Sequence, residues 1–151
     1  MVQALLGCRI THFINLQEAD ERVHGKPFNP YLPVAQGIAR RQGVELGFDR
    51  FPITDQQVPD IELLAACLDK IDQILADNGK PYVHCWGGNG RTGTVIGCWL
   101  IRHGRTPEQA LQEMAVGREG RRFRHDAPEN PWQRAFVMDW AQHDPALQQN
   151  G

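Results

Sequence analysis

Residues 84–94 carry the side chains best suited to chemistry in this chain. They read His-Cys-Trp-Gly-Gly-Asn-Gly-Arg-Thr-Gly-Thr, so Cys85 stands six positions before Arg91 and three of the five residues between them are glycines. Glycines let the backbone turn tightly, and successive N–H groups can then surround an anion. A helix that starts at Arg91 would add its positive end and favour a thiolate at Cys85. The planar guanidinium of Arg91 can hold two oxygens of a phosphoryl group.

Residues 83–94, VHCWGGNGRTGT, resemble the signature loop of the cysteine-dependent protein tyrosine phosphatase superfamily, His-Cys-x5-Arg-Ser/Thr. The segment is most similar to the small dual-specificity-like members, including the bacterial ones and the kinase-associated phosphatase type. The resemblance covers roughly residues 8–142. A bare Cys-x5-Arg spacing is weak evidence for this superfamily, but the strand-like residues before it and the apolar helix after it make the motif specific. The resemblance implies a phosphomonoester hydrolase with a phosphocysteine intermediate and no cofactor or metal.

The two main residues of the motif have ordinary alternatives. Cys85 is predicted to be the nucleophile that attacks phosphorus, although a lone free cysteine is often an inert packing residue. Arg91 is predicted to clamp the developing oxyanions by fixed positive charge, and its alternative is a surface arginine.

The neighbours of these two residues are predicted to complete the site. Phosphate contacts are expected from the loop between them, namely Trp86, Gly87, Gly88, Asn89 and Gly90. Trp86 either walls the pocket mouth or packs under the loop. His84 is expected to hydrogen-bond the loop backbone and support the thiolate, or to be a plain core histidine. Thr92 is expected to donate to the sulfur, or to be a simple hydroxyl at a helix start.

A general acid is needed to protonate the leaving oxygen, and two aspartates compete for this role. Asp60 follows a proline and opens a helix, so N-capping explains it. Asp55 lies in a loop just past a strand end, where catalytic residues often lie. Its Pro-Ile-x-Asp setting resembles the general-acid loop of the dual-specificity phosphatases, so Asp55 is favoured, first as acid and later as base.

The sequence departs from two patterns of the superfamily. The Trp-Pro-Asp loop of the large tyrosine phosphatases is absent, which weakens an expectation of strict phosphotyrosine preference. Lysines inside the phosphate loop, typical of phosphoinositide phosphatases, are also absent. Gln133 lies in a stretch similar to the Glu-x-x-x-Gln of the large enzymes, and helix capping is its simpler explanation.

Composition describes an ordinary globular chain of 151 residues, 41% hydrophobic and 23% charged, with net charge −2. This balance gives no general case for nucleic-acid or membrane binding. No signal peptide or transmembrane run is visible. The four cysteines lack metal-ligand spacing, which favours a reduced, cytoplasmic setting. Cys67 and Cys98 are expected to pack in the core, and a protective disulfide from either to Cys85 is left open.

Alternating patterns predict an α/β fold, a central mainly parallel sheet flanked by helices, as in the tyrosine phosphatases. Residues 1–151 are expected to form one phosphatase domain, and because the family has a short strand before the first one seen here, a trimmed N-terminus is left open. Strands are predicted at 9–16, 45–53 and 81–84, the last as a central strand, and helices at 34–41, from Pro59-Asp60, at 94–101, from Pro107 and from Pro131. The last of these helices should bury an apolar stripe formed by Trp132, Phe136, Val137 and Trp140. A basic run is expected to be a solvated face or a docking site for an acidic phosphoprotein, and it consists of Arg118, Arg121, Arg122 and Arg124.

The expected substrate is a phosphorylated protein, on phosphotyrosine and also phosphoserine or phosphothreonine, or a small phosphomonoester. One alternative is a phosphate-binding pseudophosphatase without turnover. Another is a different Cys-x5-Arg protein, such as a low-molecular-weight phosphatase, an arsenate reductase or a rhodanese-like protein. The sequence leaves the physiological substrate and the oligomeric state open.

Overall fold

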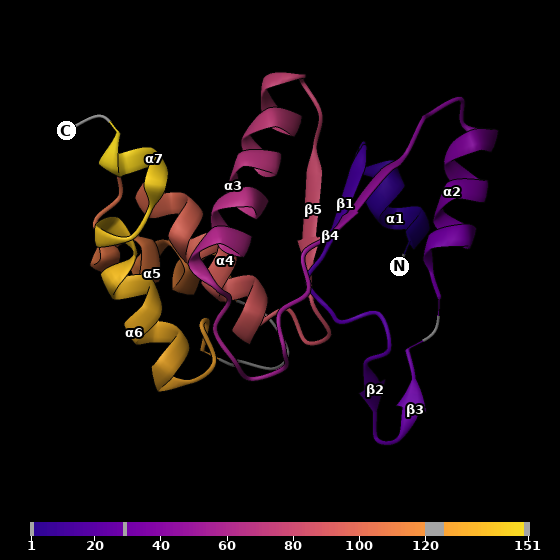
Figure 1. The fold of residues 1–151 in the computed structure, drawn as a ribbon. Helices are drawn as coiled ribbons and strands as arrows, with labels where there is room; N and C mark the ends of the chain where they lie inside the picture. The colour runs from indigo at the N-terminus through magenta and orange to yellow at the C-terminus, as the bar shows by residue number, and fades with distance from the viewer. Residues whose placement is uncertain (1, 29, 120–125, 150–151) are drawn as a thin grey trace.

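The computed structural model describes residues 2–28, 30–119 and 126–149 (Figure 1). Three strands form a parallel sheet in the order β4-β1-β5, and a small antiparallel hairpin, β2-β3, lies apart from it. The strands are β1 His12–Asn15, β2 Arg22–Val23, β3 Lys26–Pro27, β4 Gly47–Arg50 and β5 Pro81–His84. The helices are α1 Val2–Gly7, α2 Leu32–Arg41, α3 Ile61–Ala76, α4 Gly90–Arg102, α5 Pro107–Val116, α6 Pro131–Asp139, the 3-10 turn η1 Trp140–Gln142 and α7 Pro145–Gln148.

The sheet separates two hydrophobic cores. Alternate residues of a strand face opposite sides, so Phe13 of β1 packs with α1 and α2 while Ile14 packs with α3 and α4. Figure 1 shows α1 and α2 on one face of the sheet and α3 to α7 on the other. The apolar positions of α3 at steps of three and four face the larger core as far as Ile71, whereas Leu75, the next position of that pattern, is exposed and Ile74 is buried instead.

The parallel register brings three loops to one end of the sheet. Asn15, the last residue of β1, lies beside Arg50 of β4 and His84 of β5. The chain segments after these strands therefore leave the sheet at the carboxyl ends of the strands, where open α/β sheets bind ligands. This end of the sheet carries the loop of Cys85, the loop of Asp55 and the start of the long connection after β1.

Two capping signals correctly predict helix starts. Thr106 and Gln109 form a reciprocal capping box at α5, and Asn130 and Gln133 form another at α6. Gln133 is therefore a capping residue, the simpler of its two interpretations. Such boxes are readable from sequence because all their partners lie within three residues of one another.

Three expectations need correction. The strand at 81–84 is not central, because in the part of the chain that the structure describes β1 pairs on both sides whereas β5 pairs only with β1. Trp132 does not join the buried stripe and is 75% exposed, since the inward face of α6 carries Gln133 and Val137 instead. In addition, helix α1 precedes the first strand, although no helix was expected there.

Other expectations fall partly outside the description or agree with it. Of the basic run, the structure describes Arg118; Arg121, Arg122 and Arg124 lie outside the described residues. Cys67 and Cys98 are buried in the core as expected, and all four cysteines are free thiols. Among the residues that the structure describes, no helix is long and apolar enough to cross a bilayer.

Candidate active site

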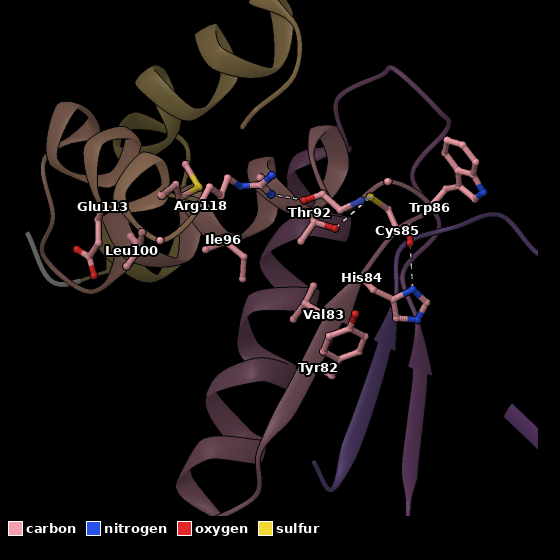
Figure 2. Close-up of a pocket in the computed structure, with 15 residues that line it drawn as sticks. Tyr82, Val83, His84, Cys85, Trp86, Thr92, Ile96, Leu100, Glu113 and Arg118 are labelled. Carbon is pink, nitrogen blue, oxygen red and sulfur yellow. Dashed lines mark hydrogen bonds between the residues drawn. The ribbon is translucent and has the colours of Figure 1, made fainter. Parts of the chain in front are cut away.

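The loop between β5 and α4 wraps the sulfur of Cys85. Cys85 follows β5 directly and is 7% exposed, and α4 begins five residues later at Gly90. Gly88 has φ of +71°, a left-handed conformation that favours glycine, and its N–H donates to the sulfur at 3.2 Å. The Thr92 hydroxyl donates to the same sulfur at 3.1 Å (Figure 2). Two donors thus converge on one sulfur atom, an arrangement that stabilises negative charge there.

Arg91 is held rigidly at the first turn of α4. Its side chain is 3% exposed; Nη1 and Nη2 donate to the two carboxylate oxygens of Glu21 at 2.5 and 2.9 Å, and Nη1 also donates to the Ile53 carbonyl at 3.1 Å. Burial disfavours the charged guanidinium, but the hydrogen bonds and charge of Glu21 outweigh burial, so the pKa of Arg91 lies above its ordinary value. The hydrogen bond from Arg91 likewise lowers the pKa of Glu21. A permanent, oriented cation therefore stands beside the cysteine loop.

Glu21 is a site residue that the sequence did not reveal. It lies in the polar connection after β1, seventy residues before Arg91, and its side chain is 10% exposed. The only available signal was a general one, that a buried arginine requires a paired carboxylate. Nothing in the sequence indicates which of many acidic residues supplies it.

The two candidate acids lie in different surroundings. The carboxylate of Asp55 is 65% exposed and lies 3.0 Å from Nη2 of Arg91. Asp60 occupies the N-cap position of α3 with extended backbone, as predicted, but its side chain makes no capping hydrogen bond. Asp55 lines the pocket that contains Cys85 and Arg91, and Asp60 does not.

This pocket has a volume of about 310 Å³ and is lined by both polar and apolar surface. Cys85, Arg91 and Asp55 lie around it. Its other lining residues are Gln56, Trp86, Gly87, Asn89, Gly90, Glu129 and Gln133. Trp86 is 56% exposed, so it lies at the mouth and does not pack under the loop. The described residues contain no cluster of three or more His, Cys, Asp and Glu side chains that could hold a metal ion.

A larger hollow of about 560 Å³ adjoins the other side of the loop, between β5, α4 and α5 (Figure 2). Arg118, which follows α5, lies beside it and donates hydrogen bonds to the carbonyl of Gly88 and the side-chain oxygen of Asn89. Arg118 thus fixes the outer side of the loop between Cys85 and Arg91. Since the Gly88 carbonyl is held outward, the N–H on the other side of the same peptide unit, that of Asn89, can turn toward the pocket.

His84 supports the loop from below. Its Nδ1–H donates to the Cys85 carbonyl at 3.2 Å, and burial lowers the pKa of the imidazole, which is therefore neutral. Nε2 is then an acceptor, and the Tyr31 hydroxyl donates to it. Asn15 in turn hydrogen-bonds this phenol, whose pKa burial raises to about 12. A chain of hydrogen bonds thus joins the end of β1 to the loop of Cys85.

A sequence model described as "Swiss Army Knife protein, DSP-PTPase phosphatase domain" matches residues 1–135. Among curated proteins, the chain is 32% identical over 95 residues to phosphatidylinositol 3,4,5-trisphosphate 3-phosphatase and protein-tyrosine-phosphatase PTEN1 of Arabidopsis thaliana, which covers 62% of this chain and 22% of that protein. It is 34% identical over 65 residues to cyclin-dependent kinase inhibitor 3 of Homo sapiens, and the match covers 42% of this chain and 31% of that protein. The chain thus spans less than a third of these relatives.

Solved structures share the whole fold. Tk-PTP in its active form superposes with a TM-score of 0.70 at 25% identity, covering 94% of this chain and 86% of that one. Kinase associated phosphatase, solved with its catalytic-site cysteine replaced by serine, superposes with a TM-score of 0.70 at 20% identity. This match covers 93% of this chain and 74% of that one. The family match spans most of the chain, and the neighbours share its parallel sheet and flanking helices. The chain therefore belongs to the DSP-PTPase phosphatase domain family, within the cysteine-dependent tyrosine and dual-specificity phosphatases.

Proposed function

We propose that this domain hydrolyses phosphomonoesters of phosphoproteins through a phosphocysteine intermediate. One observation carries the proposal: the sulfur of Cys85 accepts two hydrogen bonds at the base of a pocket that also contains Arg91 and Asp55. Nucleophile, fixed cation and proton donor are the three groups that this two-step hydrolysis requires. We further propose that residues 1–151 act as one domain and that the protein, with its cysteines reduced, functions in the cytoplasm.

In the first step, the Cys85 thiolate attacks phosphorus and the bond from phosphorus to the leaving oxygen breaks. The carboxylic acid of Asp55 gives its proton to that oxygen. Loop N–H groups and Arg91 hold the remaining phosphoryl oxygens. Glu21 keeps the guanidinium oriented. Before this step the incoming phosphoryl group replaces the Asp55 carboxylate on Nη2, and the freed carboxylate takes up from solvent the proton that it then donates.

In the second step, a water attacks the phosphocysteine and Asp55, now a carboxylate, takes its proton. The phosphorus–sulfur bond breaks and inorganic phosphate leaves. The Thr92 hydroxyl, 3.1 Å from the sulfur, stabilises the departing thiolate.

The pocket composition favours a phosphoprotein over a highly charged inositol lipid. Related proteins span both classes: the Arabidopsis relative is named for both activities, and PTPMT1, a structural neighbour at 20% identity and a TM-score of 0.69, was solved with PI(5)P. In this chain the phosphate loop contains no lysine, and the pocket lining adds the carboxylates of Asp55 and Glu129. These negative groups oppose a ligand with several phosphates. A non-protein phosphomonoester with one phosphate is the second candidate.

Turnover of a generic aryl phosphate tests the proposed reaction. Because the cradle consists of Arg91 and backbone N–H groups, activity is expected to persist in EDTA and to be inhibited by vanadate, an oxyanion of similar shape. Initial rates with and without each reagent measure both effects. Loss of activity in EDTA that a divalent metal restores would refute a metal-free mechanism. Binding of vanadate without any turnover would instead identify a pseudophosphatase.

Tyr31→Phe is expected to slow the reaction of Cys85 because it removes the hydroxyl that orients His84. Loss of one hydrogen bond of about 0.5–1.5 kcal/mol corresponds to a roughly two- to tenfold loss in kcat/KM. The rate of Cys85 alkylation by iodoacetamide across pH, read from the modified peptide, reports the same change without a substrate.

Tyr82→Phe is the matched control for Tyr31→Phe. Tyr82 stacks on the same imidazole, with ring centroids 5.6 Å apart, whereas the Tyr31 hydroxyl bonds to its Nε2. Removing the Tyr82 hydroxyl should change the rates by less than about twofold, the scale of a lost surface contact. Equal effects of the two substitutions would show that general packing around His84, and not the Tyr31 hydrogen bond, matters.

A further inference from the structure

Two amide side chains at the start of α6 reach the loop that carries Asp55, called here the acid loop (residues 54–57). Nδ2 of Asn130 donates to the carbonyl of Gln56 at 2.9 Å, and Nε2 of Gln133 donates to the carbonyl of Gln57 at 3.3 Å. These carbonyls belong to the two residues that follow Asp55. The contacts join segments more than seventy residues apart and were not apparent from the sequence.

Each amide uses its two ends for different purposes. The oxygen of Asn130 accepts from the Gln133 N–H at 2.9 Å, and the oxygen of Gln133 accepts from the Asn130 N–H at 3.4 Å, which together form the capping box of α6. A cap needs only an oxygen acceptor, so serine or aspartate would serve about as well as asparagine. The capping box of α5 does use a threonine, Thr106. At α6 the amide adds a donor, and that donor holds the acid loop.

The two hydrogen bonds from Asn130 and Gln133 to the acid loop, called here the tether, also fix this loop relative to Arg91. Gln133 is 1% exposed, and a Cβ placed on Gly90, the residue before Arg91, would lie 2.9 Å from the Gln133 amide, so the two segments are in close contact. Gln56 has φ of +64°, a left-handed backbone conformation that residues other than glycine rarely adopt. The Asn130 hydrogen bond ends on the carbonyl of this same residue. Such a conformation persists only when surrounding contacts hold it.

We propose that Asn130 is a positioning residue for the reaction: together with Gln133 it holds the acid loop so that the Asp55 carboxyl faces Arg91 and the leaving oxygen. The inference rests on the proposed role of Asp55 as general acid. It predicts that an oxygen-only cap at position 130 stabilises α6 normally but leaves proton donation impaired.

The test compares substitutions at position 130 that keep the cap and lose the donor. Asn130→Ser is uncharged, and Asn130→Asp keeps nearly the same shape; both cap helices about as well as asparagine. Each should lower kcat on a poor leaving group by roughly 10–100-fold, because small displacements of catalytic groups are costly. On an activated aryl ester, whose leaving group needs little protonation, the loss in kcat/KM, which reports only the first step, should be below about threefold. Thr106→Ser, a similar cap exchange at α5, should change neither rate.

Thermal unfolding and a double variant separate this inference from the proposed function. The midpoint for Asn130→Ser should stay close to that of the parent. Adding Asn130→Ser to Asp55→Asn should cause little further loss on the poor leaving group, because the tether acts through Asp55. A normal leaving-group dependence in Asn130→Ser and Asn130→Asp, or fully additive losses in the double variant, would overturn the inference while leaving Asp55 as the acid. A benign Asp55→Asn would instead overturn the proposed role of Asp55.

Discussion

Replacing Cys85 with serine is expected to abolish turnover of an aryl phosphate while the fold persists. A serine hydroxyl is hardly ionised at neutral pH, so the variant lacks the anionic nucleophile that a thiolate provides. Oxygen is only slightly smaller than sulfur, and the donors from Gly88 and Thr92 retain an acceptor. Initial rates at saturating substrate, together with circular dichroism and a thermal melt, measure both parts of this expectation.

Cys8→Ser is the matched control for Cys85→Ser. Cys8 is exposed and lies outside the pocket lining, so the same chemical change there should leave the rate unaltered. Activity above a few per cent in a pure Cys85→Ser preparation would mean that the bond-forming atom is not this sulfur.

The second large effect concerns Asp55. If Asp55 donates the proton, Asp55→Asn should lower kcat on a poor leaving group by roughly 10²–10⁴-fold. On an activated ester the loss in kcat/KM, which reports only the first step, should shrink. The basic limb of the pH–rate profile should flatten, because that limb reports deprotonation of the acid. Rates measured on a series of aryl phosphates with different leaving-group pKa values, each across pH, supply both readouts.

Asp60→Asn tests the competing assignment. Asp60 lies at the N-cap of α3, makes no capping hydrogen bond and is not part of the pocket lining. Asparagine suits that position about as well as aspartate, so the substitution should be mild on every substrate. If Asp60→Asn were crippling and Asp55→Asn benign, the general acid would belong to the start of α3 and the proposed geometry would be wrong.

Local patterns explain why much of the fold was predictable. The buried face of α3, the capping boxes of α5 and α6 and the apolar core helix α4 all depend on residues within a few positions of one another. The family motif then placed the glycine-rich loop between a strand and a helix, where the structure has it. Strand order was not local information, because it depends on which edges pair across the chain, and β1 took the centre in place of β5.

The least predictable parts of the site are its supporting contacts. Glu21 reaches Arg91, Tyr31 reaches His84, and Asn130 reaches the acid loop, each across more than fifty residues. No motif links any of these residues to its distant partner: the capping box predicts the contact of Asn130 with Gln133 but not its contact with the acid loop. Only the tertiary arrangement, in which α4 packs against β5 and α6 packs against α4, selects which carboxylate, phenol or amide makes the contact.

The most direct test of the account is to detect the covalent intermediate. Asp55→Asn should slow the second step, in which water needs a base, so phosphocysteine should accumulate when this variant is mixed with an activated aryl phosphate. Acid quenching, proteolysis and mass spectrometry are expected to find one phosphoryl group on the peptide that contains Cys85, with its sulfur as the modified atom. A phosphoryl group on any other residue, or continued turnover with no phosphorylated peptide at any time point, would contradict hydrolysis through Cys85.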